Sequence, residues 1–375
     1  MESNKGRNLA LDVFRGMTVT LMIIVNTPGN GATTFAPLQH ASWNGFTPTD
    51  LVFPSFLFAV GNAMLFALPK YELMGRKAVL WKILKRTCII FLLGYLMYWF
   101  PFFAKDGSGQ WGLSPIGDTR IMGVLQRIAL GYGFGSLVLI YLKERGALIF
   151  SVLALLVYWG VLLLFGDLTL EGNAVLQLDK ALLGTSHLYT GYTSKVFGAG
   201  FPFDPEGILS TLPAIVNVIA GYLTARFIQA KGYTYETIAK MCLVGITLLF
   251  IAYWWNMVFP INKPIWSSSY VLNTVGLDLL ILATLVYIIE VLQKRDWTYF
   301  FEVFGRNTLF IYLVSELLLA VVSFVPGVRV SGIFTGMFQP LFGDYMGSFM
   351  FAICYMLVCW LVGWVLDKRK IYIKV

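Results

Sequence analysis

The amino-acid sequence predicts an all-α membrane protein, a polytopic bundle of about ten transmembrane helices. Hydrophobic residues make up 58% of the 375 residues and charged residues only 13%, whereas soluble domains are about half apolar and about a quarter charged. Aromatic residues contribute 16%, and 36 residues are glycine, which is typical of helices in a bilayer. We therefore exclude a soluble cytosolic enzyme and expect a single integral-membrane domain over residues 1–375.

Several apolar runs are long enough to cross a bilayer, which takes roughly 20 residues. They lie at 9–26, 50–69, 80–103, 121–141, 147–165, 209–228, 241–259, 271–292, 304–325 and 346–366. An even number of spans places both termini on the same side of the membrane.

The positive charges predict which side that is. Twenty of the 28 lysines and arginines lie at the termini and in the connections on one side, and six lie in the connections on the other. Because basic loops stay in the cytoplasm, we expect both termini to be cytoplasmic. The net charge of +8 then reflects membrane orientation, and we expect no nucleic-acid partner.

Two outer connections are unusually long, residues 27–49 and 167–207. Loops of this length are usually functional or disordered. The second loop is rich in aromatic residues, among them Tyr189, Tyr192 and Phe203. We therefore expect the two loops to form an ordered cap over the outer face.

The first of these loops contains the strongest candidate for acid–base chemistry, His40, because histidine titrates near neutral pH. Asn26, Trp43, Asn44 and Asp50 surround it in the sequence and could hold a sugar or a developing oxyanion. An interfacial His–Trp pair that anchors a re-entrant loop explains the same pattern without catalysis. The second histidine of the chain, His187, is expected to have a structural or substrate-facing role.

Charged residues inside the predicted spans are functional candidates because their burial is costly. Asp12 and Arg15 are three residues apart on one helix face, which suits either an internal ion pair or a ligand site. Arg127 lies beside Gln126 in the fourth run, and a buried arginine needs an anionic partner. That partner is either a ligand phosphate or a protein carboxylate, for which the spans offer Asp278 and Glu316.

Arg306 and Asn307 open the ninth run at its cytoplasmic edge, where a helix N-terminus attracts phosphate. A guanidinium that reaches toward lipid headgroups is the alternative for Arg306. The sequence has no P-loop, and its four cysteines form no CxxC pair. We therefore expect neither an ATP-driven pump nor a metal site.

Two long segments, LALDVFRGMTVTLMIIVN and HASWNGFTPTDLVFPSFLFAVGNA, resemble the catalytic core of the heparan-alpha-glucosaminide N-acetyltransferase family of transmembrane acyltransferases. Four shorter segments follow in the same order, GVLQRIAL, LLGTSHLY, FDPEGILSTLPAI and GRNTLFIYLVSEL. The resemblance implies transfer of an acetyl group from cytosolic acetyl-CoA, as co-substrate, to the amine of glucosamine or a glycan fragment on the outer side.

The resemblance also assigns roles to residues. The family's active-site histidine falls on His40 and its asparagine on Asn26. Where the animal enzymes have a late histidine this chain has Ser315, which cannot act as a base. We expect contacts to CoA from Arg127, Gln126, Arg15, Arg306 and Asn307, and contacts to the sugar from Asp50, Trp43, Asn44, His187 and Glu206 of the DPEG segment.

In the implied reaction, His40 either deprotonates the acceptor amine or briefly carries the acetyl group, and Asn26 hydrogen-bonds the thioester oxygen. Animal members carry an additional N-terminal lumenal region, so we expect a bacterial inner-membrane protein. A homodimer is compatible with the many small residues in the spans. The competing interpretations are a multi-pass transporter of amino sugars and an acyltransferase whose acceptor is a lipid-linked glycan.

Overall fold

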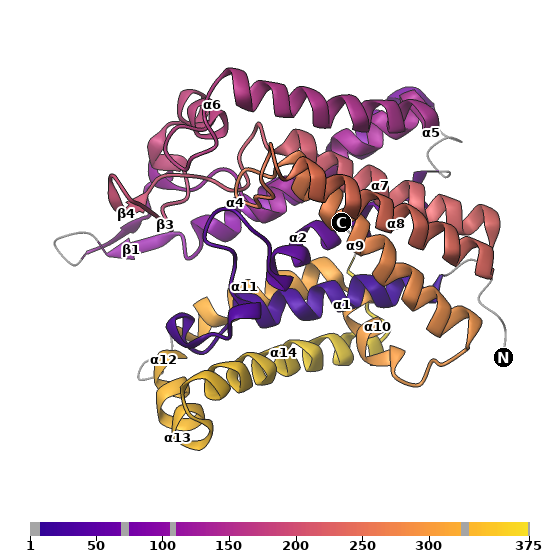
Figure 1. Cartoon of the computed structure of the whole chain (residues 1–375). Helices are drawn as coiled ribbons and strands as arrows, with labels where there is room; N and C mark the ends of the chain where they lie inside the picture. Colours follow the sequence, from indigo (N-terminus) through magenta and orange to yellow (C-terminus); the bar gives the residue numbers. More distant parts are fainter. Residues whose placement is uncertain (1–7, 69–74, 106–109, 324–329, 374–375) are drawn as a thin grey trace.

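The computed structural model describes residues 8–68, 75–105, 110–323 and 330–373. Within these ranges the chain is almost entirely helical, with two short strand pairs. β1 (Phe103–Lys105) pairs with β2 (Trp111–Leu113), and β3 (Tyr192–Ser194) pairs with β4 (Gly198–Phe201), both antiparallel. These strands gather with α6, α12 and α13 at one end of a bundle of long helices, on the left in Figure 1. All of them belong to connections that the sequence predicts to be outer.

Four long helices form the first half of the chain. They are α1 (Leu9–Asn26), α2 (Pro48–Met64), α4 (Arg76–Trp99) and α5 (Val124–Leu164). The side chain of Asn8 accepts a hydrogen bond from the amide of Leu11 and so caps α1. Proline stands at the first position of α2, where its missing N–H costs nothing. Short 3₁₀ turns occupy Gly31–Thr33, Ala36–Leu38, Ile116–Asp118 and Thr185–His187.

The 41-residue helix α5 is broken at Lys143, whose φ of 56° and ψ of −171° are not helical. A straight helix of this length would measure about 60 Å, about twice the hydrocarbon thickness of a bilayer. Val124 at its start shares a cavity with His40, and Leu168 just after its end accepts a hydrogen bond from Trp43. The chain therefore turns back at Lys143 (Figure 1), between the predicted runs 121–141 and 147–165.

The remaining helices follow α5 in the chain. They are α6 (Ala174–Leu183), α7 (Thr211–Lys231), α8 (Tyr235–Trp255), α9 (Ser268–Val286), α10 (Thr298–Arg306), α11 (Thr308–Ser323), α12 (Val330–Ile333), α13 (Gln339–Phe342) and α14 (Asp344–Lys368). π-helical turns occupy Tyr287–Val291 and Phe334–Phe338. The pair α10 and α11 is bent by 83° where the sequence predicts one run at 304–325.

The helices α2 and α7 cross in near backbone contact. A Cβ atom added to Gly61 would lie 1.9 Å from the carbonyl oxygen of Val218, and one added to Gly221 would lie 1.9 Å from that of Phe58. Such small residues let helices approach closely in a membrane protein. The crossing fixes α2, which carries Asp50, in the centre of the molecule.

The structure supports an integral membrane protein. Of the described helices, six are long and apolar enough to cross a membrane, or seven if the bent pair α10 and α11 counts as one span. α5 counts once in this number, α2 is short with 17 residues, and α4 begins with several basic residues. The predicted count of ten therefore stays a prediction. The predicted excess of basic residues on the cytoplasmic side also stays a prediction. Some of the residues counted for it lie outside the described residues, namely Lys5, Arg7, Lys70, Arg329 and Lys374.

Candidate active site

The loop that carries His40 is tied to two other connections at the same end of the bundle. The indole N–H of Trp43 donates to the carbonyl oxygen of Leu168 at 2.8 Å, and its ring packs edge-on against Phe203. The side-chain amide of Asn262 donates to that of Asn44 at 3.0 Å. Trp43 and Asn44, both predicted to contact the sugar, thus hold the loops together.

A small cavity of about 130 Å³ opens beneath these loops, on the bundle side. Its wall is formed by α1, α2, the start of α5 and three loops, which contribute His40, Glu206 and Lys263. The lining residues are Met22, Val25, Asn26, His40, Thr49, Val52, Phe53, Val124, Glu206 and Lys263. The cavity thus brings together three of the predicted site residues, His40, Asn26 and Glu206, from segments far apart in the chain.

His40 is held by the carboxylate of Asp50. Its Nδ1 lies 2.7 Å from Oδ1 of Asp50, and the side chain of Asp50 is only 1% exposed whereas that of His40 is 50% exposed. The other carboxylate oxygen accepts hydrogen bonds from the amides of Ala41 at 3.1 Å and Thr47 at 3.0 Å. Because an ionised carboxylate only accepts, we assign the proton to Nδ1, which leaves the lone pair of Nε2 available as a base.

Lys263 is the site residue that sequence reasoning missed. Its Nζ lies 3.0 Å from Nδ1 and 3.1 Å from Nε2 of His40, and 3.9 Å from Oδ1 of Asp50. Burial lowers the pKa of the Lys263 ammonium, against the opposing charges of Asp50 and Glu206. The sequence shows this lysine only as one of six outer basic residues, and no local pattern links it to a histidine 223 positions earlier.

Asn26 ends α1 at the cavity wall. Its side-chain nitrogen lies 3.5 Å from Oε1 of Glu316 in α11, at the outer limit of a hydrogen bond. The amide can therefore turn toward a ligand at small cost. Its position beside His40 in the cavity lining suits the predicted role of donor to a developing oxyanion.

Glu206 is fixed by an arginine cluster that the sequence did not reveal. Arg120 contacts both oxygens of Asp204 at 2.7 and 2.8 Å, and its Nη2 lies 2.6 Å from Oε2 of Glu206. Its guanidinium lies between the rings of Tyr98 and Tyr189. Burial alone would lower the pKa of Arg120, but the contacts to Asp204 and Glu206 raise it above its ordinary value. Arg120 therefore stays charged and holds Glu206 in the cavity wall.

His187 lies elsewhere. Its Nδ1 contacts the carbonyl oxygen of Thr119 at 2.7 Å, and its own carbonyl accepts a hydrogen bond from the amide of Ile121 at 3.3 Å. These contacts tie the connection before α5 to the long loop 167–207. His187 is not among the residues that line the His40 cavity.

A second cavity, of about 350 Å³, follows the first along the same helices, at the bend between α10 and α11. It holds three guanidinium groups, those of Arg15, Arg86 and Arg306. The full lining is Arg15, Phe56, Val60, Ala63, Met64, Arg86, Ile90, Ile128, Tyr132, Gly305, Arg306, Thr308, Leu309 and Ile373. Arg15 and Arg306 were predicted to bind CoA, whereas Arg86 was not among the predicted site residues.

The three arginines differ in how they are held. Arg15 pairs with Asp12 at 2.9 Å, as one of the two interpretations of that pair predicts. Arg306 contacts Asp367 and Glu302, each at 2.6 Å. Arg86 lies 4.6 Å from the centre of the Tyr132 ring, and its buried Nε makes no hydrogen bond to a described residue.

Asn307 holds the C-terminal segment and does not line this cavity. Its side-chain nitrogen donates to the carbonyl oxygen of Ile371 at 3.0 Å, and its side-chain oxygen accepts from the amide of Ile373 at 2.9 Å. Asn307 thereby places Ile373 in the cavity wall. Its predicted contact with CoA would be indirect.

The two cavities share three helices. On α5, Val124 lines the outer cavity and Ile128 the inner one, and on α2 the corresponding residues are Phe53 and Phe56. Four residues of helix rise about 6 Å. The walls of the two cavities therefore come within about one helical turn of each other.

A buried polar pair, Gln126 and Arg127, follows Val124 on α5, and neither residue is among those that line the two cavities. Arg127 is 0% exposed and donates to the carbonyl oxygen of Gly207 at 3.0 Å and to the hydroxyl of Ser210, while Trp266 stacks on its guanidinium. Nε and Nη1 of Arg127 and both amide atoms of Gln126 make no hydrogen bond to any described residue. Buried polar groups without partners call for an explanation such as a ligand or water.

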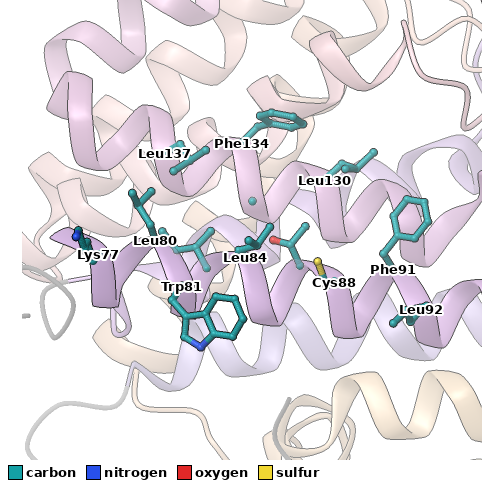
Figure 2. A pocket seen from close by; sticks show the side chains of 13 residues that line it. Lys77, Leu80, Trp81, Leu84, Cys88, Phe91, Leu92, Leu130, Phe134 and Leu137 are labelled. Carbon is teal, nitrogen blue, oxygen red and sulfur yellow. The ribbon is translucent and has the colours of Figure 1, made fainter. Parts of the chain in front are cut away.

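A larger cavity, of about 770 Å³, lies between α4 and the first arm of α5. Figure 2 shows that its side chains are almost all apolar, with Lys77 at one end and Cys88 in the wall. It holds no histidine or carboxylate. Size alone therefore does not locate the chemistry, and the smaller polar cavity at His40 is the better candidate.

Within the described ranges, no group of three histidine, cysteine, aspartate or glutamate side chains is placed to hold a metal ion. The cysteines Cys88, Cys242, Cys354 and Cys359 are free thiols.

Comparison with known proteins finds two curated relatives. Heparan-alpha-glucosaminide N-acetyltransferase from Mus musculus is 27% identical over 84% of this chain and 54% of its own length, and the enzyme of that name from Homo sapiens is 27% identical over 82% and 52%. No protein-family profile matches the chain. The chain thus spans about half the length of the curated relatives it matches, and the predicted resemblance to this family is confirmed.

Proposed function

We propose that the protein is a transmembrane N-acetyltransferase that moves an acetyl group from acetyl-CoA on the cytosolic side to the amine of a glucosamine-type sugar on the outer side. The observation that carries the proposal is the His40–Asp50 pair in a cavity one helical turn from an arginine-lined cavity. The names of the two curated relatives support acetyl transfer to a glucosaminide.

The inner cavity suits the donor. Arg15, Arg86 and Arg306 offer the charged, forked donors that phosphate groups prefer. Thr308, which begins α11, lines the same space, and the N-terminus of a helix attracts phosphate. Acetyl-CoA bound with its phosphates here would direct its thioester arm toward the outer cavity.

The buried polar pair fits the path of that arm. The unpartnered atoms of Gln126 and Arg127 can hydrogen-bond the amides of the pantetheine chain, so that their burial is compensated when the donor is bound. In this role Arg127 contacts the pantetheine arm, and the three arginines of the inner cavity bind the phosphates.

The outer cavity suits the acceptor. Glu206 lines it with a carboxylate, which can accept a hydrogen bond from the neutral amine or a hydroxyl of an amino sugar. Asp50 holds His40 with Nε2 as the free base, in the manner of the aspartate in a catalytic triad. Asn44 and Trp43 connect the loops above the cavity. They therefore affect sugar binding indirectly, by fixing the positions of these loops.

The reaction follows from this arrangement. The amine nitrogen attacks the thioester carbonyl carbon, and Nε2 of His40 accepts the proton that the nitrogen loses. Asn26 donates a hydrogen bond to the carbonyl oxygen while it carries negative charge, and loss of one such donor typically lowers kcat by about 100-fold or more. The carbon–sulfur bond then breaks, and the proton passes from His40 to the thiolate.

The test is acetylation of a panel of amino sugars by the purified protein with radiolabelled acetyl-CoA. We expect His40→Ala to lower kcat by about 100-fold or more, the usual contribution of a general base, and Asp50→Asn to lower it because the orienting carboxylate is lost. Lys195→Met changes an exposed residue of the outer loop and serves as the control.

Two outcomes would overturn the proposal. One is normal acetylation by His40→Ala, and the other is passage of intact glucosamine into proteoliposomes without consumption of acetyl-CoA, which is the behaviour of a transporter. A labelled acetyl group retained on the wild-type protein without acceptor would replace direct transfer by an acetyl-histidine route.

A further inference from the structure

We propose that Lys263 is a further catalytic residue of this reaction: its ammonium donates a hydrogen bond to the thioester oxygen and opposes the negative charge that forms there. The inference rests on the proposed function, and it deepens that function by assigning the cation of the site. Three observations carry it, namely the rigid placement of the lysine, its position in the cavity wall and the charges around His40.

The backbone at Lys263 is held in a fixed turn. The side-chain oxygen of Asn262 accepts a hydrogen bond from the amide of Ile265 at 2.9 Å, and the amide of Asn262 donates to the hydroxyl of Ser267 at 3.0 Å. The carbonyl oxygen of Lys263 accepts from the amide of Trp266 at 2.9 Å. Trp266 is itself fully buried between Phe53 and Tyr270. A donor on such a turn needs little reorganisation during catalysis.

Lys263 shares the wall of the outer cavity with His40, Asn26 and Glu206. Its Nζ lies within 3.1 Å of both ring nitrogens of His40, so an acyl carbon within reach of the base is also within reach of the ammonium. Asn26 and Lys263 come from different segments and together would provide two donors for one oxyanion. Removing either donor should therefore reduce the stabilisation of the transition state and leave the cavity open.

A simple ion pair with Asp50 does not account for this placement. The distance from Nζ to Oδ1 of Asp50 is 3.9 Å, which is too long for a hydrogen bond. The oxygens of Asp50 are instead occupied by His40, by Thr47 and by the amide of Ala41. The ammonium has three N–H donors, so its contact with His40 leaves donors for the substrate.

The charged groups around His40 come from four segments. Asp50 of α2 and Lys263 are in direct contact with the ring, Glu206 shares the cavity, and Glu316 of α11 contacts Asn26. Lys263 thus supplies a positive charge beside His40, at the place where the oxyanion would form.

The proton balance needs no further reactant. The amine nitrogen forms the bond to the carbonyl carbon, its proton moves to Nε2 of His40, and the carbon–sulfur bond breaks. The proton on His40 then passes to the departing sulfur. Lys263 keeps its proton throughout and contributes only a hydrogen bond and its charge.

The experiment compares Lys263→Met and Lys263→Arg with wild type, with kcat and KM measured across pH 5.5–9 in the acetyl-CoA and glucosamine assay. We expect Lys263→Met to lower kcat by about 100-fold, with little change in KM for acetyl-CoA. Lys263→Arg keeps the cation and its N–H donors, so it should retain clearly more of the wild-type kcat than Lys263→Met. Lys195→Met is the matched control on the same face.

Wild-type kcat in Lys263→Met would overturn the inference. Equal loss of kcat in the Met and Arg variants would assign Lys263 a purely structural role and overturn it as well. Absence of any acetylation by wild type is a different result, because it contradicts the proposed function itself.

Discussion

Asp50 serves two purposes with one carboxylate. It lies at the third position of α2 and accepts from the amide of Thr47, which caps the helix, while its other oxygen holds His40. Its main-chain carbonyl also accepts a hydrogen bond from the hydroxyl of Tyr270 at 2.6 Å. The orientation of the base is therefore fixed by the same contacts that begin the helix, and Asp50 positions His40 more directly than it could bind a sugar.

At the inner cavity, we expect Arg86→Gln to raise KM for acetyl-CoA by about tenfold or more while kcat changes little, because a charge-assisted contact to phosphate is worth about 1.5–3 kcal/mol. Steady-state kinetics at saturating glucosamine measure this. Arg86 is the clearest of the three arginines to test, since Arg15 and Arg306 also pair with carboxylates.

The matched control for this prediction is Lys85→Gln. Lys85 precedes Arg86 on α4, is exposed and is not among the residues that line the inner cavity. An equal rise of KM in both variants would mean that the general positive charge of α4 attracts the donor, and the assignment of Arg86 to the phosphates would be wrong.

At the scale of elements, breaks in helices create the site. The turn at Lys143 in α5 brings Val124 and Leu168 to the same end of the bundle, against the loop with His40. The bend of 83° between α10 and α11 opens the inner cavity beside Arg306 and Thr308. Continuous helices would leave neither feature in place.

The helix α6 carries a carboxyl group that makes the loop region sensitive to pH. Asp179 is fully buried, accepts a hydrogen bond from the amide of Ile208 at 2.9 Å, and lies against Gly207. Burial raises its pKa to about 7 from an ordinary 3.8. Between these pH values the folded protein binds a proton that the unfolded chain does not, so stability falls as the pH rises toward 7.

We therefore expect the melting temperature of the detergent-solubilised protein to fall more steeply between pH 5 and pH 8 in wild type than in Asp179→Asn. The difference in free energy of unfolding should be no more than about 4 kcal/mol, since each pKa unit corresponds to 1.36 kcal/mol. Differential scanning fluorimetry across this range measures it. Parallel pH curves for the two proteins would show that Asp179 is not the responsible group.

At the scale of the whole molecule, the sequence predicted the helical membrane class and most helix positions, because long apolar runs have few alternatives to a membrane helix. The run 9–26 coincides with α1. It also predicted that His40, Asn26 and Glu206 belong to one site, and the structure brings these three together in one cavity.

The partners of these residues could not be predicted in the same way. Lys263 and Arg120 come from distant connections, and their contacts to His40 and Asp204 depend on how the loops pack. The sequence likewise places a helix start at Arg306 and Asn307 but does not show that a helix, α10, precedes it at an angle of 83°. Contacts between segments and changes in helix direction thus required the three-dimensional structure.

Transfer across the membrane is tested by a sided assay in sealed proteoliposomes. Glucosamine is enclosed in the lumen, and radiolabelled acetyl-CoA, which does not cross the bilayer, is added outside. We expect labelled N-acetylglucosamine to accumulate inside wild-type and Lys195→Met vesicles, whereas His40→Ala vesicles stay unlabelled. Product that forms only when both substrates are on the same side would show that no acetyl group crosses the membrane, and the proposed transfer would be wrong.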